Sequence, residues 1–162
     1  MNTKIPPVQP PPAGDLSLWL SECPTLVTVR GHSMEPFLQG GDRVQVVLTT
    51  PGELSSGDLV VFERAGEVVV HRFLGWSRGG MLEMGDGQSR ANRHEIPDVV
   101  GKAVSLERTS GERIDLEEPA SAPARRQAAR RLRRRHRIHA AAGRIPFDLP
   151  RRAFLKLLRR LL

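Results

Sequence analysis

Short apolar runs separated by turn residues recur from residue 26 to residue 116, and this pattern predicts strands. Val, Leu and Ile dominate the runs, and turn pairs such as Pro51-Gly52 and Ala65-Gly66 stand between them. Several short strands at such spacing are typical of an antiparallel β fold, so the chain is predicted to be mainly β. The hairpin through Ala65-Gly66 has the clearest pattern. The predicted strands are residues 26–30, 43–48, 58–63, 67–74, 81–84, 99–107 and 113–116.

The pattern changes after residue 118. Residues 119–124 contain two prolines and lose the strand pattern, which predicts a linker. Ala, Arg and Leu dominate from Arg125 onward and favour a helix that ends at about Ala142. A second helix is predicted from about Asp148, and its apolar stripe comprises Phe154, Leu157, Leu158 and Leu161.

The first residues of the chain differ from both of these parts. Five prolines between residues 6 and 12 predict an extended arm, and residues 16–20 predict one short helical turn. A length of 162 residues suits one domain with appendages. The predicted organisation is an arm and short helix at 1–24, a β domain at 25–118, a linker at 119–124 and a basic amphipathic helical tail at 125–162.

Charge divides the chain in the same place. Residues 125–162 hold 14 Lys and Arg against one acid, whereas residues 1–124 hold 11 against 17 acids. A basic tail on a mildly acidic body indicates an anionic partner. We expect the tail to contact an anionic membrane surface or to pack on the β domain, and nucleic acid is the less favoured partner.

Several classes of site and location are not supported by the sequence. Cys23 is the only cysteine, so no internal disulfide forms, and His136 and His139 lie among arginines that repel cations. We therefore expect no metal and no cofactor, and we expect His94 to lie in a polar loop without a chemical role. No run approaches the roughly 20 apolar residues of a spanning helix, and no secretory signal is visible. A cytoplasmic or peripheral membrane location is expected.

A serine stands on a turn between the first two predicted strands. Gly31 frees the backbone just before Ser33, and Pro36 stops any helix just after it. Such a turn can hold a hydroxyl outward while neighbouring N–H groups point at a developing oxyanion. Without a base, however, Ser33 could simply bond its own backbone in a surface turn.

A histidine interrupts the apolar strand predicted at residues 67–74. A serine hydroxyl is a poor nucleophile until a neighbouring base removes its proton, and a histidine titrates near neutrality. His71 is therefore the candidate base for Ser33, although a lone histidine in a strand also fits a structural role.

Four segments in this order resemble the signal peptidase I superfamily, the S24–S26 serine peptidases that include the self-cleaving LexA-type repressors. Residues 31–42 resemble the nucleophile box Gly-x-Ser-Met-x-Pro followed by Gly-Asp, and residues 55–62 resemble a Gly-Asp-Leu-Val-Val-Phe strand. The pair His71-Arg72 is similar to the archaeal and endoplasmic-reticulum type, where bacterial members have lysine before the arginine. Residues 85–103 resemble the Gly-Asp-Asn segment and closing strand.

The resemblance implies an antiparallel signal-peptidase/LexA-like β fold and a serine endopeptidase that cleaves a leader or precursor segment. Ser33 would be the nucleophile and His71 the general base, with no cofactor. The substrate would lie as an extended strand beside residues 26–30. A non-catalytic peptide-binding relative and a LexA-like self-cleaving regulator are the alternatives.

A third group should orient His71 and stabilise its charged form. Asp86 is the first candidate, because it matches the aspartate of the Gly-Asp-Asn segment, although it could instead hold its loop together. Histidine-type members carry a further aspartate about six residues later, and Asn92 occupies the matching place. A neutral amide there could orient a histidine but would stabilise an imidazolium less.

Overall fold

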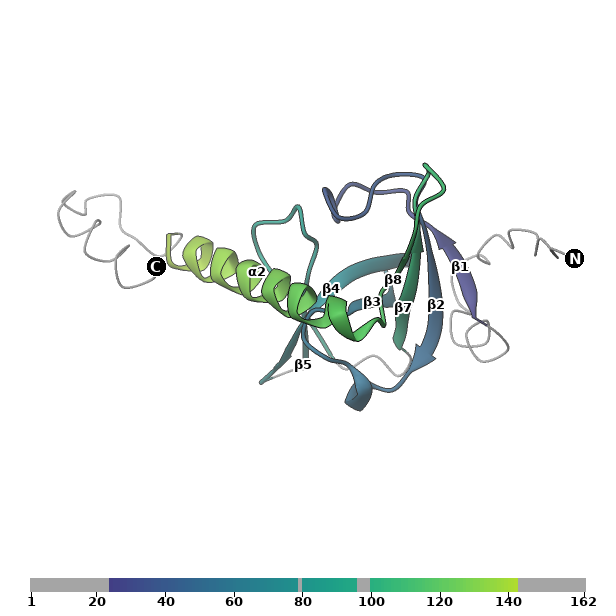
Figure 1. Cartoon of the computed structure of the whole chain (residues 1–162). Coiled ribbons are helices and arrows are strands. Elements are labelled where there is room, and N and C mark those ends of the chain that lie inside the picture. The colour runs from purple at the N-terminus through teal and green to yellow at the C-terminus, as the bar shows by residue number, and fades with distance from the viewer. Residues whose placement is uncertain (1–23, 79, 96–99, 143–162) are drawn as a thin grey trace, which may run out of the picture.

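The computed structural model describes residues 24–78, 80–95 and 100–142, and its strands form one antiparallel sheet (Figure 1). The strand order is β1-β2-β7-β3-β4-β5-β6, and β8 pairs with β7. This confirms the prediction of a mainly β fold with a C-terminal helix. The strands are β1 (Thr25–Thr28), β2 (Arg43–Thr49), β3 (Leu59–Arg64), β4 (Glu67–Ser77), β5 (Gly80–Met84), β6 (Asn92–His94), β7 (Val100–Glu107) and β8 (Arg113–Asp115).

The predicted hairpin is present. Strands β3 and β4 are joined by a two-residue turn, and they pair from Arg64 opposite Glu67 to Leu59 opposite Arg72. The strand β6 was not predicted. Its three residues are polar and carry no apolar alternation, so only the pairing with β5 defines it. Sequence patterns find strands through their buried faces, and a short polar edge strand lacks that signal.

Central strands of the sheet are buried on both faces, which explains their continuous apolar runs. Along β3, Leu59 and Val61 join one core cluster, whereas Val60 and Phe62 join another. The first cluster also contains Val44, Val46, Ala103 and Leu106, and the second also contains Phe73 and Met81.

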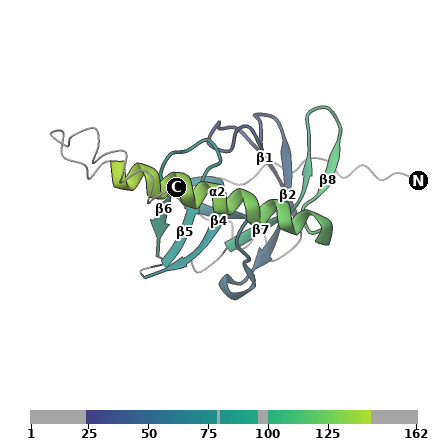
Figure 2. The ribbon, with the colours of Figure 1, turned by 60° about the vertical axis from the view of Figure 1, so that its left-hand side comes forward.

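The helix α2 (Ala122–Ala142) lies against the sheet beside β4 (Figure 2). Its buried residues Ala129 and Leu132 pack against Leu74 and Met84. The helix begins inside the predicted linker, directly after the 3-10 turn η2 (Pro119–Ser121), so residues 119–124 form this turn and the start of α2. Within the described ranges, no helix has the length and apolarity needed to cross a membrane.

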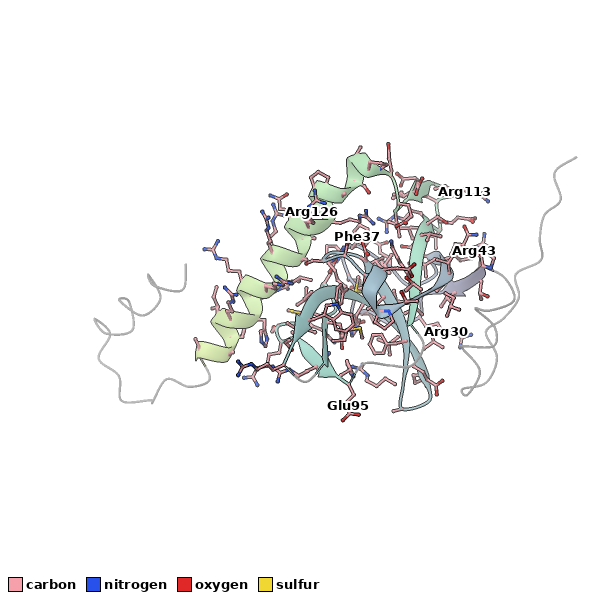
Figure 3. The ribbon with its side chains drawn as sticks, turned by 90° about the horizontal axis from the view of Figure 1, so that it is seen from below. Arg30, Phe37, Arg43, Glu95, Arg113 and Arg126 are labelled. Carbon is pink, nitrogen blue, oxygen red and sulfur yellow. The ribbon has the colours of Figure 1, made fainter. Side chains whose placement is uncertain are left out.

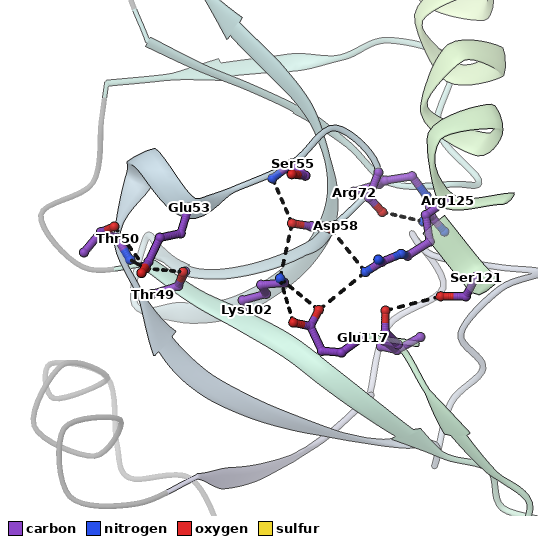
Figure 4. Close-up of polar contacts among 12 residues, drawn as sticks. Thr49, Thr50, Glu53, Ser55, Asp58, Arg72, Lys102, Glu117, Ser121 and Arg125 are labelled. Atoms are coloured by element: carbon purple, nitrogen blue, oxygen red, sulfur yellow. Dashed lines mark hydrogen bonds and ion pairs between the residues drawn. The ribbon is translucent and has the colours of Figure 1, made fainter. Parts of the chain in front are cut away.

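Ion pairs fix the first turn of α2 to the sheet (Figure 4). Arg125 Nη1 lies 3.3 Å from the buried carboxylate of Asp58 and 3.5 Å from Glu117. Lys102 Nζ reaches the same two acids at 3.6 and 2.8 Å. Gly57 permits the close approach, because a Cβ there would overlap the backbone of Arg125. The first part of the tail is therefore joined to the sheet by specific contacts.

The second predicted helix and the short turn at 16–20 fall outside the described residues. The domain boundaries remain predictions.

Candidate functional site

Two buried apolar side chains anchor the turn that carries Ser33 to the core. Met34 and Leu38 are buried in the main core cluster, and the Leu38 N–H donates to the Met34 carbonyl at 3.0 Å. Val29 and Gly41 close the base of the turn, since the Gly41 N–H donates to the Val29 carbonyl at 2.9 Å. The turn is therefore a folded unit that fixes the backbone at Ser33.

Asp42 holds the end of the same turn. Its buried carboxylate accepts the N–H of Gln39 at 2.9 Å and that of Thr109 at 3.2 Å, and it pairs with Arg108 at 2.8 Å. Burial raises the pKa of Asp42, but these hydrogen bonds and the arginine charge together bring it below its ordinary value. Asp42, in the Gly-Gly-Asp sequence after Ser33, therefore has a structural role: it holds the end of this turn.

A second loop supports the serine from behind. The N–H of Gly87 donates to the carbonyl of Ser33 at 2.9 Å. Gly85 approaches so closely that a Cβ there would overlap the same carbonyl oxygen. The glycines on both sides of Asp86 therefore fit this loop against the turn that carries Ser33.

The central observation is the contact between the two residues that the sequence singles out. Ser33 Oγ and His71 Nε2 lie 3.0 Å apart, although 38 positions separate them in the chain. His71 is on β4, opposite Val60, and its side chain is only 1% exposed. The distance is within the hydrogen-bond reach that a nucleophile and its base require.

Glu83 holds the other ring nitrogen of this histidine. The Nδ1 of His71 is hydrogen-bonded to Glu83 Oε2, and the glutamate side chain is fully buried. Glu83 lies on β5 opposite Phe73, two residues along β4 from His71, so both side chains project on one face of the sheet. An ionised carboxylate only accepts hydrogen bonds, so Nδ1 carries the proton and Nε2 is free to accept from Ser33.

The charge of Glu83 is balanced by its neighbours. Burial raises the pKa of this carboxyl, but the hydrogen bond and charge of His71 lower it, as do hydrogen bonds from His94 and Asn92. The lowering effects prevail, so the pKa of Glu83 lies below its ordinary value. His94 Nε2 lies 2.7 Å from Glu83 Oε1, so each oxygen of the carboxylate has its own histidine. His94 is thus a member of this cluster, on β6 rather than in the expected loop.

The structure corrects the expectation for Asp86. Its carboxylate accepts hydrogen bonds from Arg72 Nε at 2.8 Å and Arg72 Nη2 at 2.6 Å, and no contact with His71 is described. The physical reason is strand alternation: His71 and Arg72 are adjacent on β4, so their side chains leave on opposite faces. Glu83 takes the position expected for Asp86, and Asn92, opposite Glu83 in the β5–β6 pair, hydrogen-bonds that glutamate.

Glu83 was missed because the family motif drew attention to the neighbouring Gly85-Asp86. A signal was nevertheless present in the sequence Met81-Leu82-Glu83-Met84. An acid inside an apolar strand is almost never fully buried unless it is paired, so such a residue predicts a cationic or N–H partner.

Among the described residues, no group of three or more His, Cys, Asp or Glu side chains is arranged to hold a metal ion.

The comparison with protein families agrees with this part of the chain. Residues 16–85 match the family model described as Peptidase S24-like. The matched segment contains Ser33, His71 and Glu83, and it supports a peptidase-type fold of the S24 or LexA kind. No curated protein and no solved structure matched the chain.

Proposed function

We propose that this chain is a serine endopeptidase in which Ser33 is the nucleophile, His71 the general base and Glu83 the group that orients the base. One observation carries the proposal: Ser33 Oγ, the His71 ring and the buried Glu83 carboxylate form a continuous series of hydrogen bonds. The match of residues 16–85 to an S24-like peptidase model supports the same reaction class.

The proposed chemistry follows from these positions. As Ser33 Oγ attacks a peptide carbonyl, its proton passes to Nε2 of His71, and Glu83 stabilises the imidazolium that results. His71 then gives that proton to the leaving amine, and an acyl ester remains on Ser33. Water, activated by the same imidazole, hydrolyses this ester and restores the serine hydroxyl.

The proposed substrate is an extended segment of a leader or precursor protein, as in signal peptidases. The strand β1 stands at one end of the described strand order and leads directly into the Ser33 turn. A peptide that added to this edge would receive main-chain hydrogen bonds from β1 and would reach Ser33. Side-chain pockets would then select the residues beside the cleaved bond.

The test compares wild type with Ser33→Ala, using candidate precursor peptides and a fluorophosphonate probe that labels activated serines. We expect cleavage and labelling by wild type and neither by Ser33→Ala. Ser110→Ala is the matched control, because Ser110 is exposed in the β7–β8 turn. Equal cleavage by both enzymes would reject the mechanism. Peptide binding without turnover, unchanged by Ser33→Ala, would instead support a non-catalytic peptide-binding protein.

Self-cleavage is the second candidate, and the match to an S24-like model favours it. A chain that cuts itself would fragment at a rate independent of its concentration, and Ser33→Ala would abolish the fragments. Intact mass measured over time, at two protein concentrations, separates this function from cleavage of a separate substrate.

We also propose an anionic membrane surface as the partner of the basic tail. The face of α2 that turns away from the sheet exposes arginines (Figure 3), and they have no ion-pair partner among the described residues. Anionic headgroups attract such a row of cations. The exposed arginines are Arg126, Arg130, Arg131, Arg134 and Arg137.

Sedimentation with vesicles tests this partner. We expect binding to phosphatidylcholine vesicles that contain phosphatidylserine, weaker binding at high salt, and weaker binding after Arg126, Arg130 and Arg134 are changed together to Gln. Arg113→Gln is a control, because Arg113 is exposed on β8 and pairs with Glu107. Retention on DNA but not on anionic vesicles would assign the arginines to nucleic acid instead.

A further inference from the structure

The carboxylate that orients His71 is shared with a second histidine. His94 Nε2 lies 2.7 Å from Glu83 Oε1, while His71 holds Oε2. The side chains of Glu83 and His71 are 0% and 1% exposed, but that of His94 is 23% exposed. His94 is therefore the most exposed of these three side chains.

The surroundings of His94 hold its ring in one orientation. It is on β6 opposite Met81, on the same face of the sheet as Glu83. The ring of Phe62 packs against it with 5.0 Å between centroids and also contacts His71 at 6.3 Å. Because an ionised carboxylate cannot donate, Nε2 of His94 carries a proton in either charge state of the ring.

The charged groups that face His94 come from three strands. Glu83 on β5 accepts its hydrogen bond, Arg64 on β3 lies 3.8 Å from the same carboxylate oxygen, and His71 on β4 holds the other oxygen. Arg64 keeps its charge at all working pH values, so it contributes a constant field.

We propose that His94 is a positioning residue of the peptidase, which fixes Glu83 for His71. This inference rests on the proposed function of Ser33 and His71. His94 holds Oε1 of Glu83 by its hydrogen bond, so that Oε2 is kept facing Nδ1 of His71.

Two substitutions separate the hydrogen bond from the packing. His94→Gln retains an N–H donor near the position of Nε2, whereas His94→Phe retains the packing against Phe62 and has no donor. His139→Gln is the matched control, because His139 is exposed on α2. Circular dichroism and thermal melting establish that each variant is folded.

The activity measurement is the rate of Ser33 labelling by a fluorophosphonate probe as a function of pH. We expect His94→Phe to label about tenfold more slowly than wild type at every pH, since a charge-assisted hydrogen bond is lost. His94→Gln should label at close to the wild-type rate, because its amide N–H replaces the donor to Glu83. An unchanged rate in folded His94→Phe, or a rate in His94→Gln as low as that of His94→Phe, overturns the proposal.

A second measurement does not depend on activity. Proton NMR in water should show a downfield ring N–H resonance of His71, retained in His94→Gln and His139→Gln and broadened in His94→Phe. A resonance that is identical in all four proteins overturns the positioning role. If wild type is not labelled at Ser33, the peptidase proposal fails, while this resonance still reports whether His94 orders Glu83.

Discussion

Two acids, Glu83 on β5 and Asp86 just after it, are three residues apart but bind different kinds of side chain. Glu83 is fully buried and binds two histidines, one on each oxygen. Asp86 is 13% exposed and binds the guanidinium of Arg72 through both oxygens. Their histidine and arginine partners are adjacent on β4. Because side chains alternate along β4, the histidine contacts Glu83 on one face of the sheet and the arginine contacts Asp86 on the other.

The difference shows what makes a carboxylate useful in a reaction. Arg72 is always charged, so its pair with Asp86 has one protonation state and serves to hold the loop behind Ser33. His71 changes its charge during the proposed reaction, so its pair with Glu83 gains strength as the imidazolium forms. The type of partner, more than the distance from Ser33, therefore distinguishes the proposed role of Glu83 from the structural role of Asp86.

The largest expected effect is that of Glu83→Gln on activity. Removal of the charge should lower the rate of peptide cleavage about 10⁴-fold, which is the loss caused by the equivalent Asp→Asn change in a Ser-His-Asp protease. Glu95→Gln is the control, because Glu95 is exposed directly after β6. A loss of less than tenfold in a folded Glu83→Gln protein would contradict the role given to Glu83.

Asp86→Asn should act on stability instead. Arg72 is 2% exposed, so it would remain buried without its counter-charge, and the free energy of unfolding should fall by about 3–5 kcal/mol. Urea denaturation measures this, with Asp115→Asn as an exposed control. Below its unfolding transition, the variant should cleave within tenfold of wild type. A specific loss of cleavage as large as that of Glu83→Gln would erase the distinction.

Arg135→Gln weakens the Asp86 side of the comparison by a smaller step. Arg135 Nη2 donates to the backbone carbonyl of Asp86 at 2.6 Å, from α2 to the loop behind Ser33. Loss of this charged hydrogen bond should lower the free energy of unfolding by about 1.5–3 kcal/mol. Arg134→Gln, on the exposed side of the same helix, should change it little. Equal effects of the two substitutions would argue against the contact.

Acid unfolding should distinguish Glu83 by its pH dependence. Because the pKa of Glu83 is lowered in the folded state, its stabilisation is present above the ordinary value of 4.5 and is lost as pH falls through the folded value. Stability curves between pH 7 and pH 2 should therefore fall less steeply in Glu83→Gln. The lowered pKa values of Asp42 and Glu107 still leave an acid transition in that variant. Identical slopes would mean that Glu83 is not held ionised.

The smallest effect is expected at the exposed pair His32–Glu35. The hydrogen bond and charge of Glu35 raise the pKa of His32, whose Nδ1 lies 2.7 Å from Glu35 Oε1. Glu35→Gln should lower the pKa of His32 in an NMR titration and leave the unfolding midpoint unchanged, because solvent screens an exposed pair. A shifted midpoint would show that burial is not what separates this glutamate from Glu83.

The sequence predicts local features of the site well and the contacts between distant strands poorly. The turn at Ser33 and the strand of His71 each have their own pattern within about ten residues, so both were identified. Glu83 depends on the register of β5 against β4, and His94 depends on β6, a strand without an apolar face. Such contacts are set by pairing across the sheet, which no single segment encodes.

The contacts of helix α2 could not be predicted for a related reason. Its arginines dominate the composition, so the sequence left open whether the basic tail packs on the β domain or contacts an anionic surface. Only Ala129 and Leu132 are buried, but they meet Leu74 and Met84, and Arg135 and His136 bond to the loop after β5. Two apolar positions were enough because specific polar contacts accompany them.

The attachment of α2 also limits how the protein can be shortened. A chain cut at residue 118 would leave Leu74 and Met84 without the side chains that cover them, and Asp58 without Arg125. Fresh apolar surface of this kind favours aggregation during expression. Any truncation intended to isolate the β domain should therefore keep the chain through Ala142.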